Sequence, residues 1–552
     1  MAKRWKLYTA STLALTLALA GCSSTGNSGD SASKEGGEGS DEKKVLNLSA
    51  ASDIPTMDSS LATDQVSFYI MNQTQEGLYR LGEDDKAVDG IAEGEPEVSE
   101  DSKKYTFKLR EDAKWSNGDP VTAKDFEYGW KRTLDPETAS EYGYIMYDIK
   151  NAEAVNTGKK KVDELGIKAV DDYTLEVELE KPLPYFKELL TFATFYPLNE
   201  KYVEEQGDKF GTTEEKTLYN GPFELTDWET ESKFKLVPNE EYWDKEAVKL
   251  DEVNFQVVKD PQTAINLYET GKIDIVGLSA EHVDNYKEDP NFNTELRTST
   301  FFMRFNQNDE IMANKNVRLA INKAIDKEKY VKSNLNNGSI AFDKLTPKEF
   351  VKGPDEKDYV EGVKSELSYD LEGAKEAWEK AKKELGKDKI EIELLTYDSE
   401  TSKTDAEYFQ AQLQKNLDGL SLKIKQQPFK QKLALESKGD YQLSFAGWGP
   451  DYPDPMTFVD MFVTDGAHNQ MEWSNSEFDK LVKDAKGELA DKPEERWAAM
   501  QEAENILLED AAIMPMYQAG AAYLQQPYIK NYQRHKFGAD MTFKHVDIEG
   551  KE

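Results

Sequence analysis

The pattern of apolar and polar positions predicts a mixed α/β protein whose second half alternates strands with helices. Residues 390–395, 420–424 and 441–445 have the length and apolar content of buried strands. Between them, residues 404–417 and 429–437 are long enough to form helices. Strands and helices in this order form a parallel sheet, and ligands of such sheets bind beyond the carboxyl ends of the strands. We therefore expect a binding site just after these strands.

The first half predicts a smaller α+β unit followed by mixed strands. Residues 105–110 alternate between apolar and polar side chains, as a strand with one buried face does. Thr122 is a good N-cap for a helix that begins at Ala123. With a further hairpin signal, this pattern indicates a separate unit over residues 78–192.

One stretch, Tyr441 to Phe462, gathers unusual chemistry after a predicted strand. Gly447, Gly449 and three prolines are expected to end that strand at Phe445. The turn that follows then holds an aromatic ring beside carboxylates, which suits a ligand that places an apolar group next to a cation.

The candidate side chains in this turn are Trp448, Tyr452, Asp451 and Asp454. A solvated surface turn is the alternative interpretation, since Gly, Pro and Asp are common turn residues. The place of the turn beyond a strand end favours a binding site.

The N-terminus indicates export. Basic residues precede an apolar run from Leu7 to Ala20, which is too short to span a bilayer. The sequence Leu-Ala-Gly-Cys ending at Cys22 resembles the lipobox of bacterial lipoproteins, which implies cleavage before Cys22 and a lipid on its sulfur. A plain secretory signal is the alternative. Residues 23–44 contain one apolar side chain, Ala32, and read as a flexible tether.

Composition narrows the functional classes. The chain has 106 acidic and 69 basic residues, a net charge of −37, with both signs interspersed, so nucleic acid is not an expected partner. The 4 His form no HExxH pair and the 1 Cys is Cys22, so neither a metal site nor a disulfide is expected. Phosphate-loop and serine-elbow motifs are also absent. No cofactor is expected.

Six segments resemble, in order and spacing, the landmarks of the solute-binding proteins of oligopeptide ABC transporters, often called OppA-like. The resemblance covers nearly the whole mature chain. The segments are Tyr105 to Phe126, Asn220-Gly-Pro-Phe223, Asn239-Glu-Glu-Tyr-Trp243, Tyr268 to Asp274, Val317 to Asp326, and Met514-Pro-Met-Tyr517.

This resemblance implies a class II periplasmic-binding fold of two hinged lobes with an inserted domain. It implies a non-catalytic, monomeric receptor that binds oligopeptides and delivers them to an ABC permease from a lipid anchor on the cell membrane. The long tether favours a single-membrane, Gram-positive envelope. The implied division is a signal peptide at 1–21, a lipidated Cys and tether at 22–44, one lobe from 45–77, 193–300 and 514–552, an inserted domain at 78–192, and a second lobe at 301–513.

The resemblance also implies which residues bind the ligand. The family residue that binds the peptide α-ammonium matches Asp451. Backbone contacts and a pocket wall match Gly447, Trp448 and Gly449, and the tyrosines expected to line the cleft are Tyr268, Tyr517 and Tyr142. Asp454, between two prolines, is expected to shape the turn.

The chain departs from some members where the peptide C-terminus is held. Phe445 stands where those members have a basic residue, and residues 398–403 lack their His. Recognition of the C-terminal carboxylate, and with it the preferred peptide length, is therefore left open.

Other functions remain open at the level of sequence. A secreted hydrolase could use Asp451 and Asp454 as a carboxylate pair. A receptor of the same fold could bind another solute or a signalling peptide. An adhesin or chaperone would bind protein without lobe closure.

Overall fold

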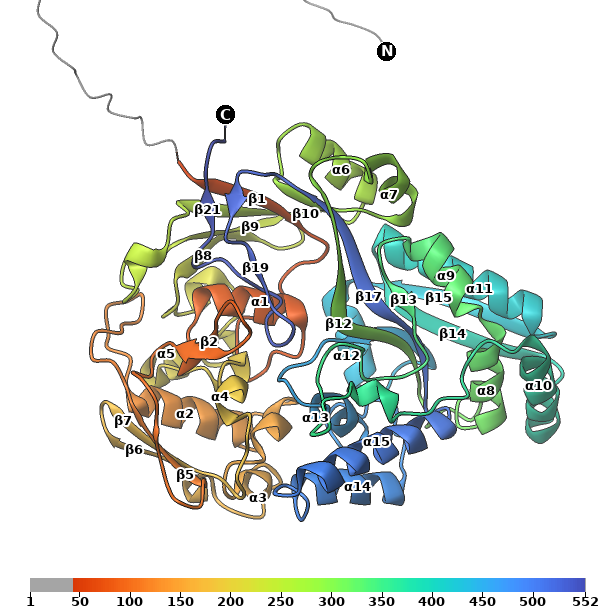
Figure 1. Ribbon diagram of the computed structural model, residues 1–552, viewed down its shortest axis with the longest axis horizontal. Helices are drawn as coiled ribbons and strands as arrows, with labels where there is room; N and C mark the ends of the chain where they lie inside the picture. The colour runs from red at the N-terminus through yellow and green to blue at the C-terminus, as the bar shows by residue number, and fades with distance from the viewer. Residues whose placement is uncertain (1–42, 552) are drawn as a thin grey trace, which may run out of the picture. The chain divides into compact units, whose positions relative to one another are not determined.

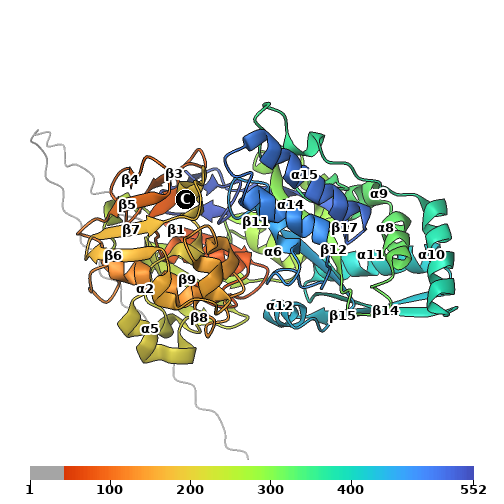
Figure 2. The same cartoon turned by 90° about the horizontal axis from the view of Figure 1, so that it is seen from below.

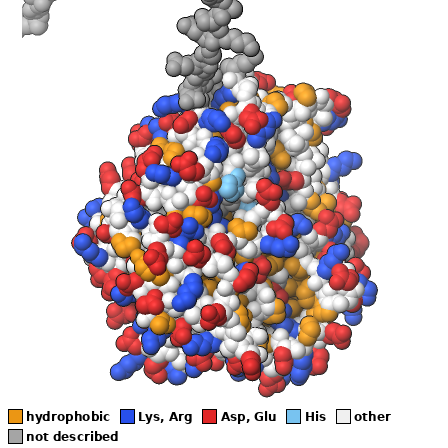
Figure 3. All heavy atoms as spheres, turned by 60° about the vertical axis from the view of Figure 1, so that its left-hand side comes forward, with side chains coloured by type: hydrophobic (Ala, Val, Ile, Leu, Met, Phe, Trp, Pro, Cys, Tyr) orange, Lys and Arg blue, Asp and Glu red, His pale blue; other side chains and the backbone are white. Residues whose placement is uncertain are grey.

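The computed structural model describes residues 43–551, so the predicted signal peptide and Cys22 lie outside the described residues. None of the helices in the described range is long and apolar enough to cross a membrane. On the face shown in Figure 3, acidic and basic side chains are intermixed and do not gather in a patch of one sign.

Two four-stranded sheets and one larger sheet organise the described chain (Figure 1). In the first sheet, β1 lies at one edge and pairs in parallel with β10. Its strands, in spatial order, are β1 (Val45–Ala50), β10 (Glu252–Val257), β9 (Lys233–Pro238) and β8 (Phe223–Glu229). The second lies in the predicted inserted domain and comprises β4 (Glu97–Val98), β5 (Lys104–Lys108), β7 (Thr174–Glu178) and β6 (Ile167–Asp171).

The largest sheet carries the strands that lead to the site. Its spatial order is β11 (Ile275–Gly277), β17 (Ile513–Gln525), β12 (Phe292–Phe305), β16 (Leu443–Trp448), β14 (Ile390–Tyr397) and β15 (Leu420–Gln427), with β13 (Ile340–Ala341) paired to β17. Three short two-stranded pairs complete the strands, namely β2 (Tyr79–Leu81) with β3 (Ala87–Asp89), β18 (Ile529–Lys530) with β21 (Asp547–Ile548), and β19 (Gln533–Arg534) with β20 (Met541–Thr542).

Helices cover these sheets, and α11 packs on β14 and β15 while α8 and α10 pack against each other (Figure 1). Their bounds are α1 (Gln65–Thr74), α2 (Ala123–Leu134), α3 (Ala152–Asn156), α4 (Phe186–Leu189), α5 (Glu200–Gln206), α6 (Pro261–Glu269), α7 (Ala280–Tyr286), α8 (Lys315–Ala324), α9 (Lys327–Tyr330), α10 (Leu371–Leu385), α11 (Glu400–Asn416), α12 (Phe429–Ser437), α13 (Met456–Val459), α14 (Ser476–Lys486) and α15 (Pro493–Glu509).

Local signals predicted several of these elements correctly. Helix α2 follows Thr122, whose backbone N–H and hydroxyl donate to the Asp125 carboxylate at 2.6 and 2.9 Å. Helix α12 has the predicted bounds. These successes share a cause, because caps and short-range periodicity are encoded by neighbouring residues.

Two expectations about the large sheet need correction. The predicted parallel strands β14, β15 and β16 are parallel, but β12 and β17 join them in antiparallel fashion, so the sheet is mixed. The expected end of a strand at Phe445 is also wrong, because β16 continues through Gly447 to Trp448. Pairing with β12 along its whole length holds β16 extended despite the glycine.

The two longest strands carry the chain between the predicted lobes. β12 pairs with β17 from Phe292 to Arg304, with register shifts on the way, and its second half also pairs with β16 on the other side. The predicted boundaries at 300/301 and 513/514 fall within these two strands. The division into lobes and an inserted domain stays a prediction.

Two large apolar cores meet at β16. Trp448 belongs to the core that includes the N-terminal sheet and the segments around α13 to α15. Phe445, three residues earlier, belongs to the core between the large sheet and α8, α10 and α11. The strand before the predicted site is therefore fixed from both sides.

Glu504, on α15, is a buried carboxyl group that links stability to pH. It accepts hydrogen bonds from the backbone N–H groups of Leu345 (2.7 Å) and Thr346 (3.2 Å) and from the Thr346 hydroxyl (2.7 Å). Burial nevertheless raises the pKa of Glu504 to about 7. The stabilising contribution of the protonated form is therefore fully present below the usual carboxyl pKa and is lost as the pH rises toward 7.

We expect Glu504→Gln to remove this pH dependence, because an amide can accept from both N–H groups and donate to the hydroxyl without ionising. As the pH rises from 4.5 to 7.5, the unfolding free energy of the unsubstituted protein should fall relative to the variant by about 3 kcal/mol. Urea unfolding of both proteins across this range measures the difference. Parallel pH profiles would contradict the role of Glu504.

Candidate functional site

The end of β16 offers a free backbone edge. On one side β12 pairs with β16 along Leu443–Trp448. On the other side β14 pairs only with Leu443 and Ser444. Among residues 43–551, no second strand therefore pairs with Ala446, Gly447 or Trp448. Unpaired N–H and C=O groups at such an edge can accept another extended chain.

This edge faces a cavity of about 750 Å³. The lining comes from segments far apart in sequence, namely the β1–α1 loop, α1, the loop at Tyr142, β12, the end of β14, α12 and the turn after β16. Cavities of this size are typical of ligand sites. The expected location beyond the ends of β14 and β16 agrees with this placement, since Tyr397, Trp448 and Asp451 all line the cavity.

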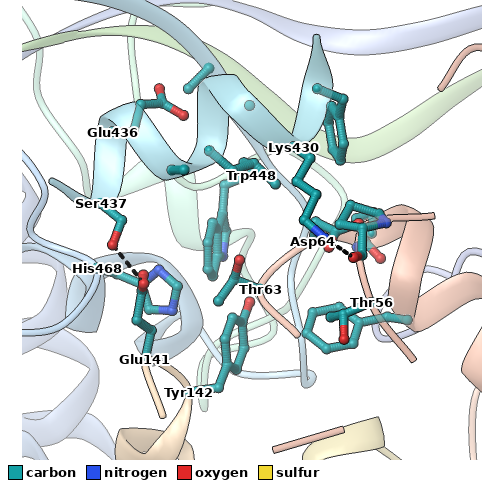
Figure 4. Close-up of a pocket in the computed structure, with 18 of the residues that line it drawn as sticks. Thr56, Thr63, Asp64, Glu141, Tyr142, Lys430, Glu436, Ser437, Trp448 and His468 are labelled. Atoms are coloured by element: carbon teal, nitrogen blue, oxygen red, sulfur yellow. Dashed lines mark hydrogen bonds between the residues drawn. The ribbon is translucent and has the colours of Figure 1, made fainter. Parts of the chain in front are cut away.

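Aromatic rings form one wall of the cavity. Trp448 stacks on Tyr142 with ring centroids 6.2 Å apart and planes within 10°, and His468 meets both edge-on at 5.1 and 4.6 Å (Figure 4). Burial lowers the pKa of His468 to about 3, so the ring is neutral at physiological pH. Trp448 Nε1 and His468 Nε2 are buried and have no hydrogen-bond partner among the described residues. The wall is apolar, with two polar atoms left open.

Asp451 is a buried carboxylate that lacks a counter-charge. Its side chain is 2% exposed, and the described residues place no Lys, Arg or His within 4 Å of it. The Tyr142 hydroxyl lies 3.5 Å from both carboxylate oxygens, a weak contact. Burial raises the pKa of Asp451 well above its usual value. A ligand cation would supply what this carboxylate lacks.

Asp454, three residues later, is fully paired. Its oxygens receive two hydrogen bonds from the Arg496 guanidinium at 2.7 and 2.8 Å, and Oδ1 also accepts from the backbone N–H of Met456 at 3.0 Å. This fits the expectation that Asp454 shapes the turn. The hydrolase interpretation needs Asp454 as the second carboxylate of a catalytic pair. Asp454 does not fit that role, because a carboxylate held in an ion pair is not a general acid.

Close packing requires a glycine at position 447 and leaves little room for a side chain at position 449. A Cβ on Gly447 would lie 2.7 Å from the Phe301 ring, and one on Gly449 would lie 3.1 Å from Ser299 Oγ and 3.2 Å from Gln65 Nε2. Both residues line the cavity without a side chain.

The structure separates the three predicted tyrosines. Tyr142 lines the cavity beside Asp451. Tyr517, on β17, lies behind the lining, where its ring stacks on Phe301 at 4.8 Å. Tyr268, on α6, packs in another apolar cluster and its hydroxyl accepts from Asn291 Nδ2 at 3.2 Å. The structure thus brings Asp451, Trp448, Gly447, Gly449 and Tyr142 together, places Tyr517 one layer behind, and leaves Tyr268 outside.

Sequence reasoning missed several lining residues. Asp64 is the N-cap of α1 and accepts from the Ser67 N–H at 2.9 Å, and burial raises its pKa to about 6. Arg304 is a single cation within the otherwise apolar end of β12, a signal that could have been noticed. His468 had no local signal, because it lies in an irregular segment.

Helix α12 lines the cavity and bonds to residues on its other side. The Lys430 ammonium donates to the Pro55 carbonyl at 2.9 Å, and the Ser437 hydroxyl donates to Glu141 Oε1 at 2.6 Å (Figure 4). In Figure 2, α12 lies where the elements before residue 240 meet β14 and β15. These contacts hold the two sides of the cavity together.

The two aspartates should have opposite effects on stability. Asp454→Asn breaks a buried ion pair and should lower the unfolding free energy by about 3 kcal/mol. Asp451→Asn removes a buried, uncompensated charge and should raise the stability of the ligand-free protein by about 1 kcal/mol at pH 7.5. Urea unfolding of protein refolded without ligand measures both changes. Equal losses in the two variants would show that Asp451 is a structural residue.

Comparisons with known proteins agree with this geometry. The family model described as "Bacterial extracellular solute-binding proteins, family 5 Middle" matches residues 86–470. The dipeptide-binding protein DppE of Bacillus subtilis is 35% identical, over 95% of this chain and 96% of its own.

Two solved structures are also similar over nearly their whole length. Listeria monocytogenes OppA bound to peptide has a TM-score of 0.90 and 47% identity, and covers 92% of this chain and 100% of its own. The substrate-binding domain of an oligopeptide ABC transporter from Bacillus anthracis has a TM-score of 0.90 and 49% identity, over 92% and 99% of the two chains.

These matches confirm the expected mixed α/β binding-protein fold and the expectation of a non-catalytic, extracytoplasmic protein. The chain belongs to the bacterial extracellular solute-binding proteins of family 5.

Proposed function

We propose that this protein captures oligopeptides in the cavity beside β16 and delivers them to an ABC permease for import. The observation that carries the proposal is the buried, unpaired carboxylate of Asp451 at the end of a free strand edge. Peptides of any sequence share an N-terminal ammonium and an extended backbone, and these two features of the cavity match them.

The first contact is with the peptide N-terminus. An α-ammonium beside Asp451 would pair two charges in a closed cavity, where such hydrogen bonds are stronger than in water. The Tyr142 hydroxyl, 3.5 Å from the carboxylate, would help to orient it.

The second contact is with the peptide backbone. An extended peptide can pair with the free edge at Ala446, Gly447 and Trp448, as in β-strand addition. Gly447 and Gly449 keep this edge accessible. Backbone pairing does not depend on side chains, so it suits a receptor for varied peptides.

The third contact is with side chains. Trp448 and Tyr142 supply an aromatic wall for the first residues of the ligand. Tyr517 would act through Phe301, on which it stacks. Tyr268 lies outside the cavity and is not part of this contact set.

We infer delivery from a membrane anchor. A lipid on Cys22 and a tether to residue 44 would hold the binding unit near the permease and let it reorient. The receptor would act as a monomer at the outer face of a single cell membrane. Hinged lobes would close over the peptide, and the contacts of α12 with Pro55 and Glu141 would join them.

The direct experiment is mass spectrometry of ligand released by denaturing the purified protein. Intact peptides of mixed sequence are expected. An empty cavity that also fails to bind a peptide library in calorimetry would overturn the proposal.

Asp451→Asn should weaken binding of a peptide with a free N-terminus and uncharged side chains by about 2–4 kcal/mol, because the buried ammonium loses its counter-charge. N-acetylation of the peptide should cost the unsubstituted protein a similar amount and cost the variant little. Isothermal titration of both peptides against both proteins measures this coupling.

Tyr268→Phe is the matched control, since it alters a tyrosine outside the cavity, and its affinities should be unchanged. If acetylated and free peptides bind the unsubstituted protein equally, Asp451 does not hold the α-ammonium.

A further inference from the structure

A second ionic group lies in the same cavity, on the side of α12. Glu436 Oε1 accepts from the Lys432 ammonium at 2.7 Å and from the Ser444 hydroxyl at 2.6 Å, and Arg304 Nη1 lies 3.7 Å away. Arg304 Nη1 also donates to the Gln470 side chain. Arg304, Glu436 and Gln470 line the cavity, and Lys432 is fully buried behind them.

The group carries more positive than negative charge. Two cations, Arg304 and Lys432, share one carboxylate, Glu436. His468 is neutral, so it adds no charge. A structural ion pair would need only one cation for Glu436, and Lys432 already makes the shorter contact with it. Arg304 is therefore the cation left in excess.

Arg304 also has donors to spare. Its Nε and Nη2 groups make no hydrogen bond with any residue of 43–551, although the side chain is only 7% exposed. A guanidinium presents its N–H groups as a planar fork that fits a carboxylate. The unused side of Arg304 is thus a ready anion partner inside the cavity.

The position fits a peptide anchored at Asp451. Arg304 is opposite Ser444 in the β12–β16 register, and Thr300 is opposite Trp448. These four residues of strand span about 13 Å, at ~3.3 Å per residue, which an extended peptide would cross in about four residues. A peptide that starts at Asp451 and lies along the free edge from Trp448 to Ala446 continues toward Arg304.

We propose that Arg304 binds a carboxylate of the ligand, either the C-terminus of a short peptide or an Asp or Glu side chain of a longer one. The inference rests on the proposed peptide-binding function and adds a preference for ligand charge to it. Some family members have a basic residue on β16, at the position of Phe445. In this chain the cation lies instead on the neighbouring strand, β12.

The test is calorimetry of one peptide frame in four forms against the unsubstituted protein and Arg304→Gln. The reference is a C-amidated peptide with a free N-terminal ammonium and no charged side chain; its C-terminus and side chains are uncharged, so it is called the neutral reference. The other forms restore the free C-terminus, or place Glu or Lys at the third or fourth residue. Free-C-terminus and Glu peptides separate the two sources of carboxylate.

We expect at least one carboxylate form to bind the unsubstituted protein about tenfold to a hundredfold more tightly than the neutral reference, and Arg304→Gln to abolish that gain. The neutral peptide should bind both proteins within about threefold. Glu436→Gln increases the excess positive charge and should strengthen carboxylate binding. Unchanged affinity of Arg304→Gln for the neutral reference guards against a folding defect in that variant. Lys438→Gln alters another cation of the lining and is the matched control, with the gain expected to remain.

The inference is overturned if the Lys peptide binds best, if no carboxylate form gains affinity, or if Arg304→Gln weakens all four peptides equally. Failure of the neutral reference to bind the unsubstituted protein would instead count against the proposed function. The two failures are therefore distinguishable.

Discussion

The buried carboxylate of Asp451 is the constraint around which the site is built. Moving a charge out of water is costly unless a partner of opposite sign accompanies it, and the described residues give Asp451 none. The fold must therefore hold this group in place by other means. The Asp454–Arg496 pair fixes the turn from one end, and the Asp451 backbone N–H donates to Thr457 Oγ1 at 3.0 Å from the other. This arrangement fits the proposed role of Asp451 as the partner of a ligand cation.

The second constraint is the free edge of β16, which the same segment must keep open. Pairing with β12 holds the strand extended, while the early divergence of β14 exposes one side of it. Gly447 is needed because Phe301 packs against that position, and Phe301 is in turn supported by Tyr517. The core thus determines which side of the strand a ligand can reach. The same few contacts therefore stabilise β16 and keep its free edge accessible.

Sequence reasoning reached this site through local signals and through resemblance, and it failed where distant segments decide. Caps and periodicity placed α2 and α12 well, because neighbouring residues encode them. The extension of β16 to Trp448 and the mixed sheet depend on β12 and β17, which are far away in sequence. The role of Arg304 was missed for the same reason. A lone Arg in an apolar strand is visible, but its excess charge appears only when Lys432 and Glu436 are placed beside it.

Closure of the proposed lobes over a peptide would link these features energetically. Excluding water from the cavity strengthens every charge interaction inside it, favourable or unfavourable. Without a ligand, such closure would bury Asp451 without a counter-charge and Arg304 with only a share of Glu436, so the contacts of Lys430 with Pro55 and of Ser437 with Glu141 would have to offset that cost. A peptide bound as proposed would supply the missing charges and backbone partners, and would shift the balance toward the closed arrangement by the difference in its affinity for the two states. The charges that make an empty closed cavity costly would therefore make the closed state depend on a bound ligand.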